Sequence, residues 1–182
     1  QAEHVRDAIR AQETLEAARR LLPTPEPPML ECEHLLAELQ VAYYSGAPDD
    51  AIGVGLRALE VAKSHGFPFE SALAALYVGE CYLRLTDFKR AFAHLRYTFD
   101  IAREHRFTKL QYRALAILGF LDAVKFGSED GRRRLLEAAR YAEERGHVGD
   151  LVQALYLLAF LDEKQGDVAA AVRGFREVLR LS

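Results

Sequence analysis

The chain has 182 residues, 50% of them hydrophobic, and 24 Lys and Arg residues against 27 Asp and Glu residues give a formal net charge of −3. This length and apolar content suffice for one domain with a real core. The charge balance argues against a dedicated nucleic-acid or anionic-membrane surface, because either needs a basic excess. With no apolar run near ~18 residues and no recognisable signal peptide, we expect a cytoplasmic protein without a membrane partner.

The first segment, 1–22, predicts an N-terminal helix, because Val5, Ile9 and Leu15 recur on one side of it. Prolines crowd the next residues and predict a stiff, extended linker over 23–29. The helix could equally be the back half of an earlier repeat, since Ala11 precedes Ala51 by the same step that separates Ala51 from Ala91. The chain begins with Gln1, and its only methionine is Met29, which suggests a piece of a longer protein.

From residue 30 to residue 182 the sequence predicts an all-α chain of amphipathic helices joined by tight turns, without strand alternation. The helices are expected near 30–45, 48–65, 69–85, 88–105, 109–126, 129–145, 151–165 and 168–181. They group into four pairs that cover about 30–67, 68–107, 108–147 and 148–182.

Small residues recur through this region at a fixed step in the numbering. One series is Ala51, Ala91, Gly131 and Ala171, and another is Gly79, Gly119 and Ala159, so successive members of each differ by 40 in position. A small residue at one register predicts that two helix backbones approach closely at the same place in every unit.

Two further features concern single positions. Gly53 and Gly55 lie inside a predicted helix and cost roughly 1 kcal/mol each relative to Ala, so we interpret them as close-packing points. Arg106 stands where the neighbouring units have Gly66 and Gly146, and this predicts a strained helix end. The basic run that begins at Arg132 is interpreted as a solvated helix face.

The units resemble the tetratricopeptide repeat, a helix-turn-helix unit with small and aromatic residues at fixed spacing. The matching positions are Gly79, Tyr82, Ala91 and Leu95 in the second unit, Leu115, Leu118 and Gly119 in the third, Leu155, Leu158, Ala159, Ala171 and Phe175 in the fourth, and, more loosely, Leu36, Leu39, Tyr43 and Ala51 in the first. The chain departs from the family in its period of 40 rather than about 34 residues and in having no Trp.

The resemblance implies an αα superhelix, a right-handed solenoid of antiparallel helix pairs whose first helices line a concave groove. The longer period resembles the repeats of MalT-like bacterial regulators, and also those of polarity and kinesin-light-chain adaptors; period alone does not choose between them. Two functions follow as expectations. The first is a non-catalytic scaffold that binds a peptide or partner protein, and the alternative is an effector-sensing domain of a larger bacterial transcriptional or signalling regulator.

Candidate groove residues are the first-helix positions that the repeat register projects to the concave side. They are Gln40, Tyr44, Leu76, Glu80, Leu83, Arg84, Arg113, Phe120, Val124, Gln153, Tyr156, Phe160 and Lys164. Aromatic and Arg side chains are the usual hot spots of such surfaces. Packing between units explains Phe120, Tyr156 and Phe160 equally well. Tyr44 is the stronger candidate, because one of two adjacent tyrosines must face away from the buried stripe.

Catalytic and metal motifs are not recognisable in the sequence. None of the six histidines forms an HxxxH or HExxH pair, and no nucleophile or phosphate-binding motif is present. Cys32 and Cys81 lie outside any CxxC motif and are interpreted as reduced apolar residues. We expect no enzyme activity, cofactor or metal. Leu179 and Leu181 predict an uncapped apolar end through which a homodimer could form.

Overall fold

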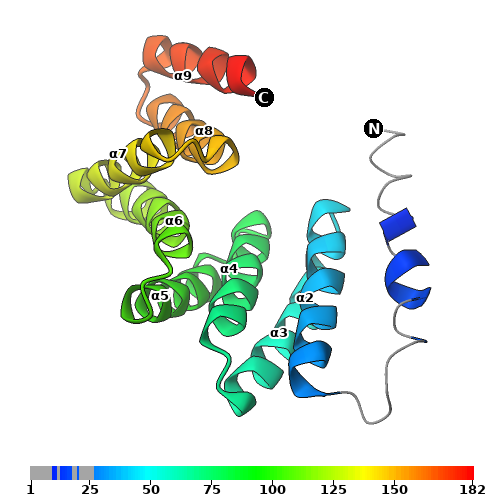
Figure 1. Ribbon diagram of the computed structural model, residues 1–182. Coiled ribbons are helices and arrows are strands. Elements are labelled where there is room, and N and C mark those ends of the chain that lie inside the picture. The colour runs from blue at the N-terminus through cyan, green and yellow to red at the C-terminus, as the bar shows by residue number, and fades with distance from the viewer. Residues whose placement is uncertain (1–9, 12, 18–19, 21–26) are drawn as a thin grey trace. The chain divides into compact units, whose positions relative to one another are not determined.

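The computed structural model describes residues 10, 11, 13–17, 20 and 27–182, and within these residues it is helical without a strand (Figure 1). The chain divides into two compact units, Gln1–Phe107 and Thr108–Ser182, here called unit 1 and unit 2. Unit 1 contains α2 (Pro28–Tyr44), α3 (Pro48–His65), α4 (Pro68–Arg84) and α5 (Phe88–Glu104). Unit 2 contains α6 (Thr108–Phe126), α7 (Glu129–Glu144), α8 (Val148–Lys164) and α9 (Val168–Leu181).

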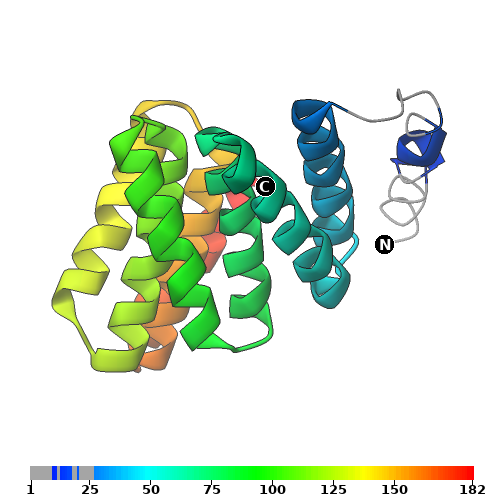
Figure 2. The same cartoon turned by 90° about the horizontal axis from the view of Figure 1, so that it is seen from below.

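These bounds lie within three residues of those that the sequence predicts, and the all-α helical-repeat class is confirmed. Within unit 1, α4 packs against both α2 and α3, and within unit 2, α8 packs against both α6 and α7. Figure 2 shows the helices of unit 2 lying alongside one another. The first helix of a pair therefore rests on the whole preceding pair, as a stacked repeat requires.

The structure describes only part of the N-terminal segment, so it tests only some of the predictions made for that segment. Most of the expected helix 1–22 and the first four residues of the expected linker 23–29 lie outside the described residues. Pro28 and Met29, assigned to the linker, are instead the first residues of α2. Proline suits the first position of a helix because its missing N–H would have no partner there. Pro48 and Pro68 begin α3 and α4 in the same way.

Three of the other helices are capped by a side chain. The carboxylates of Asp87 and Asp167 accept hydrogen bonds from the backbone N–H groups of Arg90 and Ala170, at 3.1 and 2.9 Å. The Ser128 hydroxyl accepts one from the N–H of Gly131 at 3.3 Å. Each bond satisfies a donor that the first turn of a helix leaves free.

The helix ends confirm the prediction for Arg106. Its φ is 60°, whereas Gly66 and Gly146, at the equivalent turns, have φ of 71° and 67°. A second non-glycine residue with positive φ, Thr86 at 59°, was not anticipated. Left-handed backbone costs roughly 1–2 kcal/mol for a residue with a Cβ, so unit 1 carries strain at two turns.

The predicted close approaches occur at several of the small residues. An added Cβ on Gly119 would lie 2.6 Å from the carbonyl oxygen of Gly131, so backbone meets backbone between α6 and α7. A Cβ on Gly174 would lie 2.7 Å from the Cβ of Ala159. Gly55 is also a close-packing point, because a Cβ there would collide with Val78.

Gly53 corrects the interpretation made for it. No atom lies within 4 Å of the position that its Cβ would occupy, and the residue is exposed. The physical reason is its register: two residues along a helix, at about 100° per residue, point to nearly opposite sides. Gly55 therefore faces the core of unit 1 while Gly53 faces away from it.

The core of unit 1 is a continuous apolar cluster drawn from α2, α3 and α4. Cys32 and Cys81 are both fully buried in it, which agrees with their interpretation as apolar residues. Burial raises the pKa of each thiol to about 11. Neither thiol is therefore a thiolate near neutral pH, and both are shielded from reagents.

Unit 2 contains ion pairs that modify the interpretation of the arginine run. Arg132 Nη1 donates to Asp162 Oδ1 of α8 at 2.6 Å, and Arg134 Nη1 donates to Asp122 Oδ2 of α6 at 2.6 Å. Only Arg133 lies on a solvated face, with its pair Asp130. Successive helix residues point about 100° apart, so a run of three arginines contacts both neighbouring helices.

Candidate functional site

In unit 1 a tyrosine and arginine edge forms where α2 and α4 end, made of Tyr43, Tyr44, Tyr77 and Arg84. The rings of Tyr43 and Tyr77 meet edge to face with centroids 5.0 Å apart. Arg84 Nη1 donates to the Tyr43 carbonyl oxygen at 3.1 Å, and its guanidinium carbon lies 5.4 Å from the Tyr43 ring centroid. Tyr44, edge-on to Tyr43 at 5.1 Å, is 71% exposed.

This arrangement explains the roles of the paired tyrosines. Tyr43 packs on Tyr77 and Arg84, while the adjacent Tyr44 points to solvent. The hydrogen bond and the cation–π contact restrict the rotamers of Arg84 although its side chain is exposed. An aromatic ring and a cation are thus presented together at little further cost in side-chain entropy.

In unit 2 the aromatic residues form a second patch. Tyr156 of α8 lies 6.5 Å from Phe160 and 5.8 Å from Phe175, ring centroid to ring centroid, and Phe175 belongs to α9. The Lys164 ammonium sits 5.0 Å from the Phe160 centroid. Tyr156 is 48% exposed. The patch combines first-helix and second-helix residues, so it is not purely the first-helix surface that the repeat register predicts.

The remaining candidate groove residues differ in burial. Leu76, Glu80 and Phe120 are buried, at 0%, 2% and 7% exposure. For Leu76 and Glu80 this differs from the exposure expected of groove residues, because side chains on the middle turns of a first helix pack against neighbouring helices. For Phe120 it agrees with the alternative explanation, packing. The other positions are exposed or half-buried: Gln40, Leu83, Arg113, Val124 and Gln153.

Sequence reasoning missed Tyr43 and Phe175 as members of these surfaces, and Tyr77 as the buried ring against which Tyr43 packs. For Tyr43 and Tyr77 the cue was weak, since both also suit the buried stripe. For Phe175 a cue existed. Its register partners, Gly55, Leu95 and Leu135, are all buried, so an aromatic ring at that register in α9 indicates a packing face.

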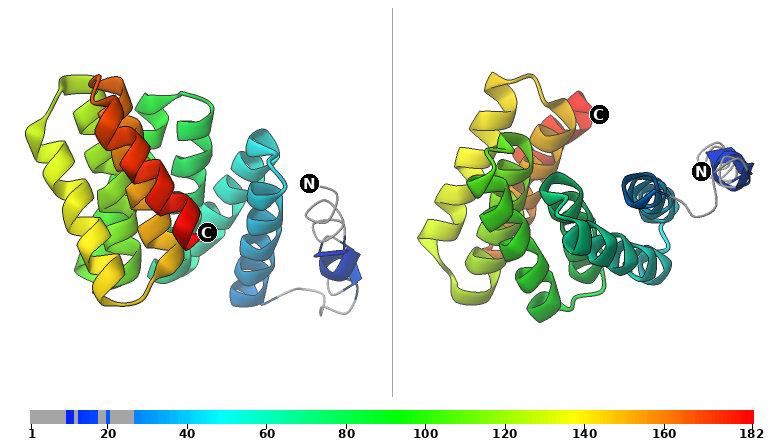
Figure 3. Two further views of the ribbon diagram at one scale, coloured as in Figure 1. Left: turned by 90° about the horizontal axis from the view of Figure 1, so that it is seen from above. Right: turned by 60° about the horizontal axis from the view of Figure 1, so that its bottom comes forward.

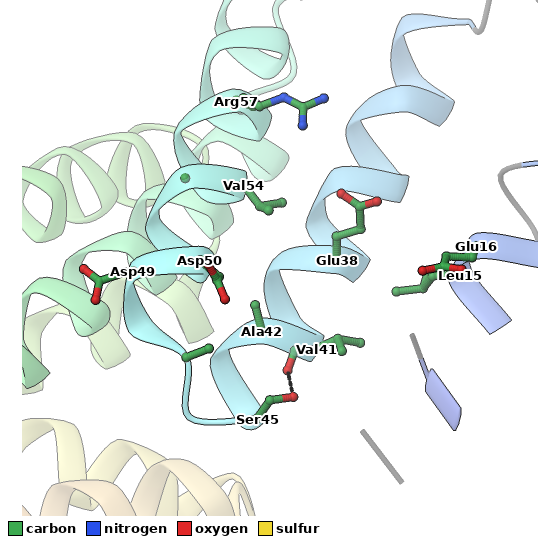
Figure 4. Close-up of a pocket in the computed structure, with 12 residues that line it drawn as sticks. Leu15, Glu16, Glu38, Val41, Ala42, Ser45, Asp49, Asp50, Val54 and Arg57 are labelled. Carbon is green, nitrogen blue, oxygen red and sulfur yellow. Dashed lines mark hydrogen bonds between the residues drawn. The ribbon is translucent and has the colours of Figure 1, made fainter. Parts of the chain in front are cut away.

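A groove of about 690 Å³ lies along the outer side of α2 and α3 (Figure 4). Val41, Val54 and Ala42 form its apolar floor, and Leu15 and Glu16 lie across from them. Acidic side chains line it: Glu16, Glu38, Asp49 and Asp50, with Arg57 at one end.

The groove's outer wall follows the repeat register. Leu15 and Glu38 stand one repeat before Gly55 and Val78, which contact each other in the core of unit 1. Leu15 and Glu38 thus face each other across the groove, as Gly55 and Val78 do in the core. The assignment of 1–22 to an earlier repeat stays a prediction.

Comparisons with known proteins agree on architecture. No protein-family profile matches the chain, and no curated protein matches its sequence. The apo form of RapI superposes with a TM-score of 0.76 at 18% identity, covering 96% of this chain and 64% of RapI. The fold is a TPR-like helical repeat. Aspartyl phosphate phosphatase F from Bacillus subtilis matches at a TM-score of 0.68 and 18% identity, over 86% of this chain and 41% of its own.

A third helical protein, BtubC from P. vanneervenii, has a TM-score of 0.68 at 16% identity and covers 98% of this chain and 73% of its own. The present chain therefore spans less than two thirds of the first two proteins. At these identities the likeness concerns the fold, and none of the three names assigns an activity to this chain.

No group of three or more His, Cys, Asp or Glu side chains among the described residues could hold a metal ion. Of the helices that the structure describes, none combines the length and apolarity that a bilayer crossing requires.

Proposed function

We propose that this chain is a non-catalytic scaffold that binds a peptide or a partner protein on the first-helix surface of its repeats. The observation that supports it best is the tyrosine and arginine edge of unit 1. There Tyr44 stands exposed beside an Arg84 that is already held by Tyr43. Tyr and Arg are enriched among residues that dominate binding energy.

The chemistry of this edge favours a partner that offers a carboxylate next to an apolar or aromatic side chain. A guanidinium has five N–H donors, so Arg84 can hold the Tyr43 carbonyl and still receive a carboxylate. Tyr44 supplies a flat apolar surface with a polar tip. Gln40 and Leu83, half-buried on the same two helices, would extend the surface, and Arg113, Val124 and Gln153 would take the equivalent role in unit 2.

The test compares capture from the native lysate by the wild-type chain and by Tyr44→Ala and Arg84→Glu. Both changes should remove the same bound protein or peptide, reducing its yield at least about tenfold, as expected for hot-spot residues. Phe92→Ala, which removes a 42% exposed aromatic ring from the second helix α5, is the control and should leave capture unchanged. Equal loss in all three variants, or in none, would overturn the proposal.

A second candidate function is effector sensing within a larger regulator. The groove along α2 and α3 favours it, because its volume of about 690 Å³ lies within the usual range of small-molecule sites. A metabolite screen by thermal shift tests it: an effector should raise the melting temperature, and Val54→Glu should remove that shift. The likeness to MalT-like regulators and the cytoplasmic location stay predictions.

A further inference from the structure

Two tyrosines of unit 2 form a close, nearly parallel ring stack between α6 and α7. The ring centroids of Tyr112 on α6 and Tyr141 on α7 lie 4.0 Å apart, and the ring planes are 12° from parallel. The two helices, α6 in light green and α7 in yellow, pack side by side (Figure 3). Two other tyrosine pairs are different: Tyr43 meets Tyr44 and Tyr77 edge to face, at 5.1 and 5.0 Å, which is the commoner arrangement of aromatic rings.

The repeat register shows that packing does not require phenol rings at this place. The equivalent pairs of positions in the other three helix pairs hold Cys32 and Val61, Ala72 and Ile101, and Val152 and Leu181. Small or aliphatic side chains therefore suffice where the two helices of a pair meet. Only the pair α6 and α7 places two oxidisable rings there, and it places them face to face.

A carboxylate stands ready to accept the phenol proton of Tyr112. Burial raises the pKa of Tyr112, and so does the nearby Glu137 carboxylate, which also accepts a hydrogen bond from the Tyr112 hydroxyl. The phenol therefore keeps its proton near neutral pH. When a phenol loses an electron its proton becomes strongly acidic, so a base already bonded to that proton makes the oxidation easier.

The face-to-face arrangement suits the next chemical step, the joining of two ring radicals. In a parallel stack the π systems of both rings overlap, and the ring carbons beside the hydroxyl groups can bond to each other. Edge-on rings, such as those of Tyr43 and Tyr44, lack this overlap. Tyr112 and Tyr141 are both half-buried, so a small oxidant in solution can reach them.

We propose that Tyr112 and Tyr141 are an oxidative modification site, at which a one-electron oxidant joins the two rings as a dityrosine. Each phenol gives up one electron and one proton; the Tyr112 proton passes to Glu137 and the Tyr141 proton to solvent. One carbon–carbon bond then forms between the Cε atoms of the two rings, and the hydrogens on those carbons move to the phenol oxygens. The protein loses two hydrogen atoms in total, and α6 becomes covalently joined to α7. This proposal is independent of the scaffold function proposed above.

The experiment exposes the whole chain to visible light with a ruthenium trisbipyridyl complex and persulfate, each persulfate taking up two electrons to become two sulfate ions. The wild type should gain dityrosine fluorescence and lose the mass of two hydrogen atoms while still running as a monomer on a denaturing gel. Mass mapping of its peptides should place the bond between Tyr112 and Tyr141. Tyr112→Phe and Tyr141→Phe should each abolish this bond. The cross-linked chain should unfold at a higher urea concentration, because the bond closes a loop in the unfolded state.

Tyr44→Phe is the matched control, because Tyr44 is a more exposed tyrosine that meets its neighbour edge-on. It should leave the yield of the bond unchanged. Glu137→Gln should slow bond formation by about tenfold or more, since an amide accepts a proton poorly, and its circular dichroism should match the wild type because Glu137 is exposed. An intramolecular bond that persists in Tyr112→Phe, or cross-links that join only separate molecules, would overturn the proposal. An unchanged rate in Glu137→Gln would overturn the role given to the carboxylate.

Discussion

Units 1 and 2 can be compared position by position, because the repeat register pairs each residue of one with an equivalent residue of the other. In unit 1 two of the helix ends with positive φ are glycines, Gly46 and Gly66, and the other two are Thr86 and Arg106. In unit 2 the helix ends with positive φ are all glycines: Gly127, Gly146 and Gly166. Gly79 of unit 1 faces the Leu95 side chain, whereas Gly119 of unit 2 faces the backbone of Gly131. Unit 2 thus has glycine turns and a rigid contact between backbones, whereas unit 1 has two strained turns and a side-chain contact at Gly79 that can adapt.

The difference shows that one repeat pattern can be stabilised in separate ways. Unit 2 adds ion pairs from α7 to both neighbouring helices, while unit 1 relies on an apolar cluster that holds both cysteines. The same kind of substitution should therefore have opposite effects in the two units. The following expectations run from the largest effect to the smallest.

Gly131→Ala should be the most damaging change. Its Cβ would lie 2.6 Å from the backbone nitrogen of Ala123 and would also collide with the Gly119 carbonyl, and backbone atoms cannot rotate away. We expect a loss of about 3 kcal/mol in the free energy of unfolding, measured by urea titration. Gly53→Ala in unit 1, where the new methyl meets nothing, should instead stabilise by about 0.5–1 kcal/mol. Equal effects of the two changes would contradict the close approach of α6 and α7.

Asp162→Asn should rank second, with a loss of about 2 kcal/mol, because it leaves Arg132 without its charged partner at a mostly buried position. Arg133→Ala removes an exposed arginine from the same run and should change the free energy by less than about 0.5 kcal/mol. Urea unfolding measures both. If Asp162→Asn had only a small effect, the ion pair would not stabilise unit 2, whose stability would then come from its apolar contacts alone.

Arg106→Gly should stabilise unit 1 by about 1 kcal/mol, because glycine adopts the left-handed backbone without steric cost. Both cysteines lie in unit 1, so the rate at which a thiol reagent labels them reports opening of that unit. Labelling should slow in Arg106→Gly. The mirror experiment, Gly146→Ala in unit 2, should destabilise by a similar amount. Faster labelling of Arg106→Gly would mean that the arginine side chain contributes more than its backbone strain costs.

The smallest effect concerns pH. Burial and the nearby Lys63 ammonium lower the pKa of His94, which stacks on Tyr82 with centroids 5.6 Å apart. The folded state thus binds a proton less readily than the unfolded state, so this contribution to stability is complete above the ordinary histidine pKa of about 6.5 and falls as pH drops below it. Thermal melts of the wild type and His94→Gln from pH 7.5 to 5 should diverge below that point. Parallel curves would exclude His94 as the source.

The sequence was sufficient for the elements, since helix ends carry Pro, Asp, Ser or Gly at regular positions. It was also sufficient for Arg106, because a missing glycine at a known register indicates strain. It failed at Gly53, where a helix-breaking residue faces solvent, and at Leu76, where a groove position is buried. For Phe120 it left groove and packing as equal alternatives, and the residue is buried. Accessibility depends on which helix lies across a position, and a single repeat does not contain that information.

The even placement of the helices has a consequence for how such a chain can evolve. Helices begin at residues 28, 48, 68, 88, 108, 148 and 168, with only α7 displaced by one residue. Recombination that removes or duplicates one whole repeat leaves every turn joined to an equivalent turn. A deletion that is two residues too short or too long would rotate all later helices by about 200° about their axes and turn their apolar faces outward. Array length in this lineage should therefore change in whole repeats.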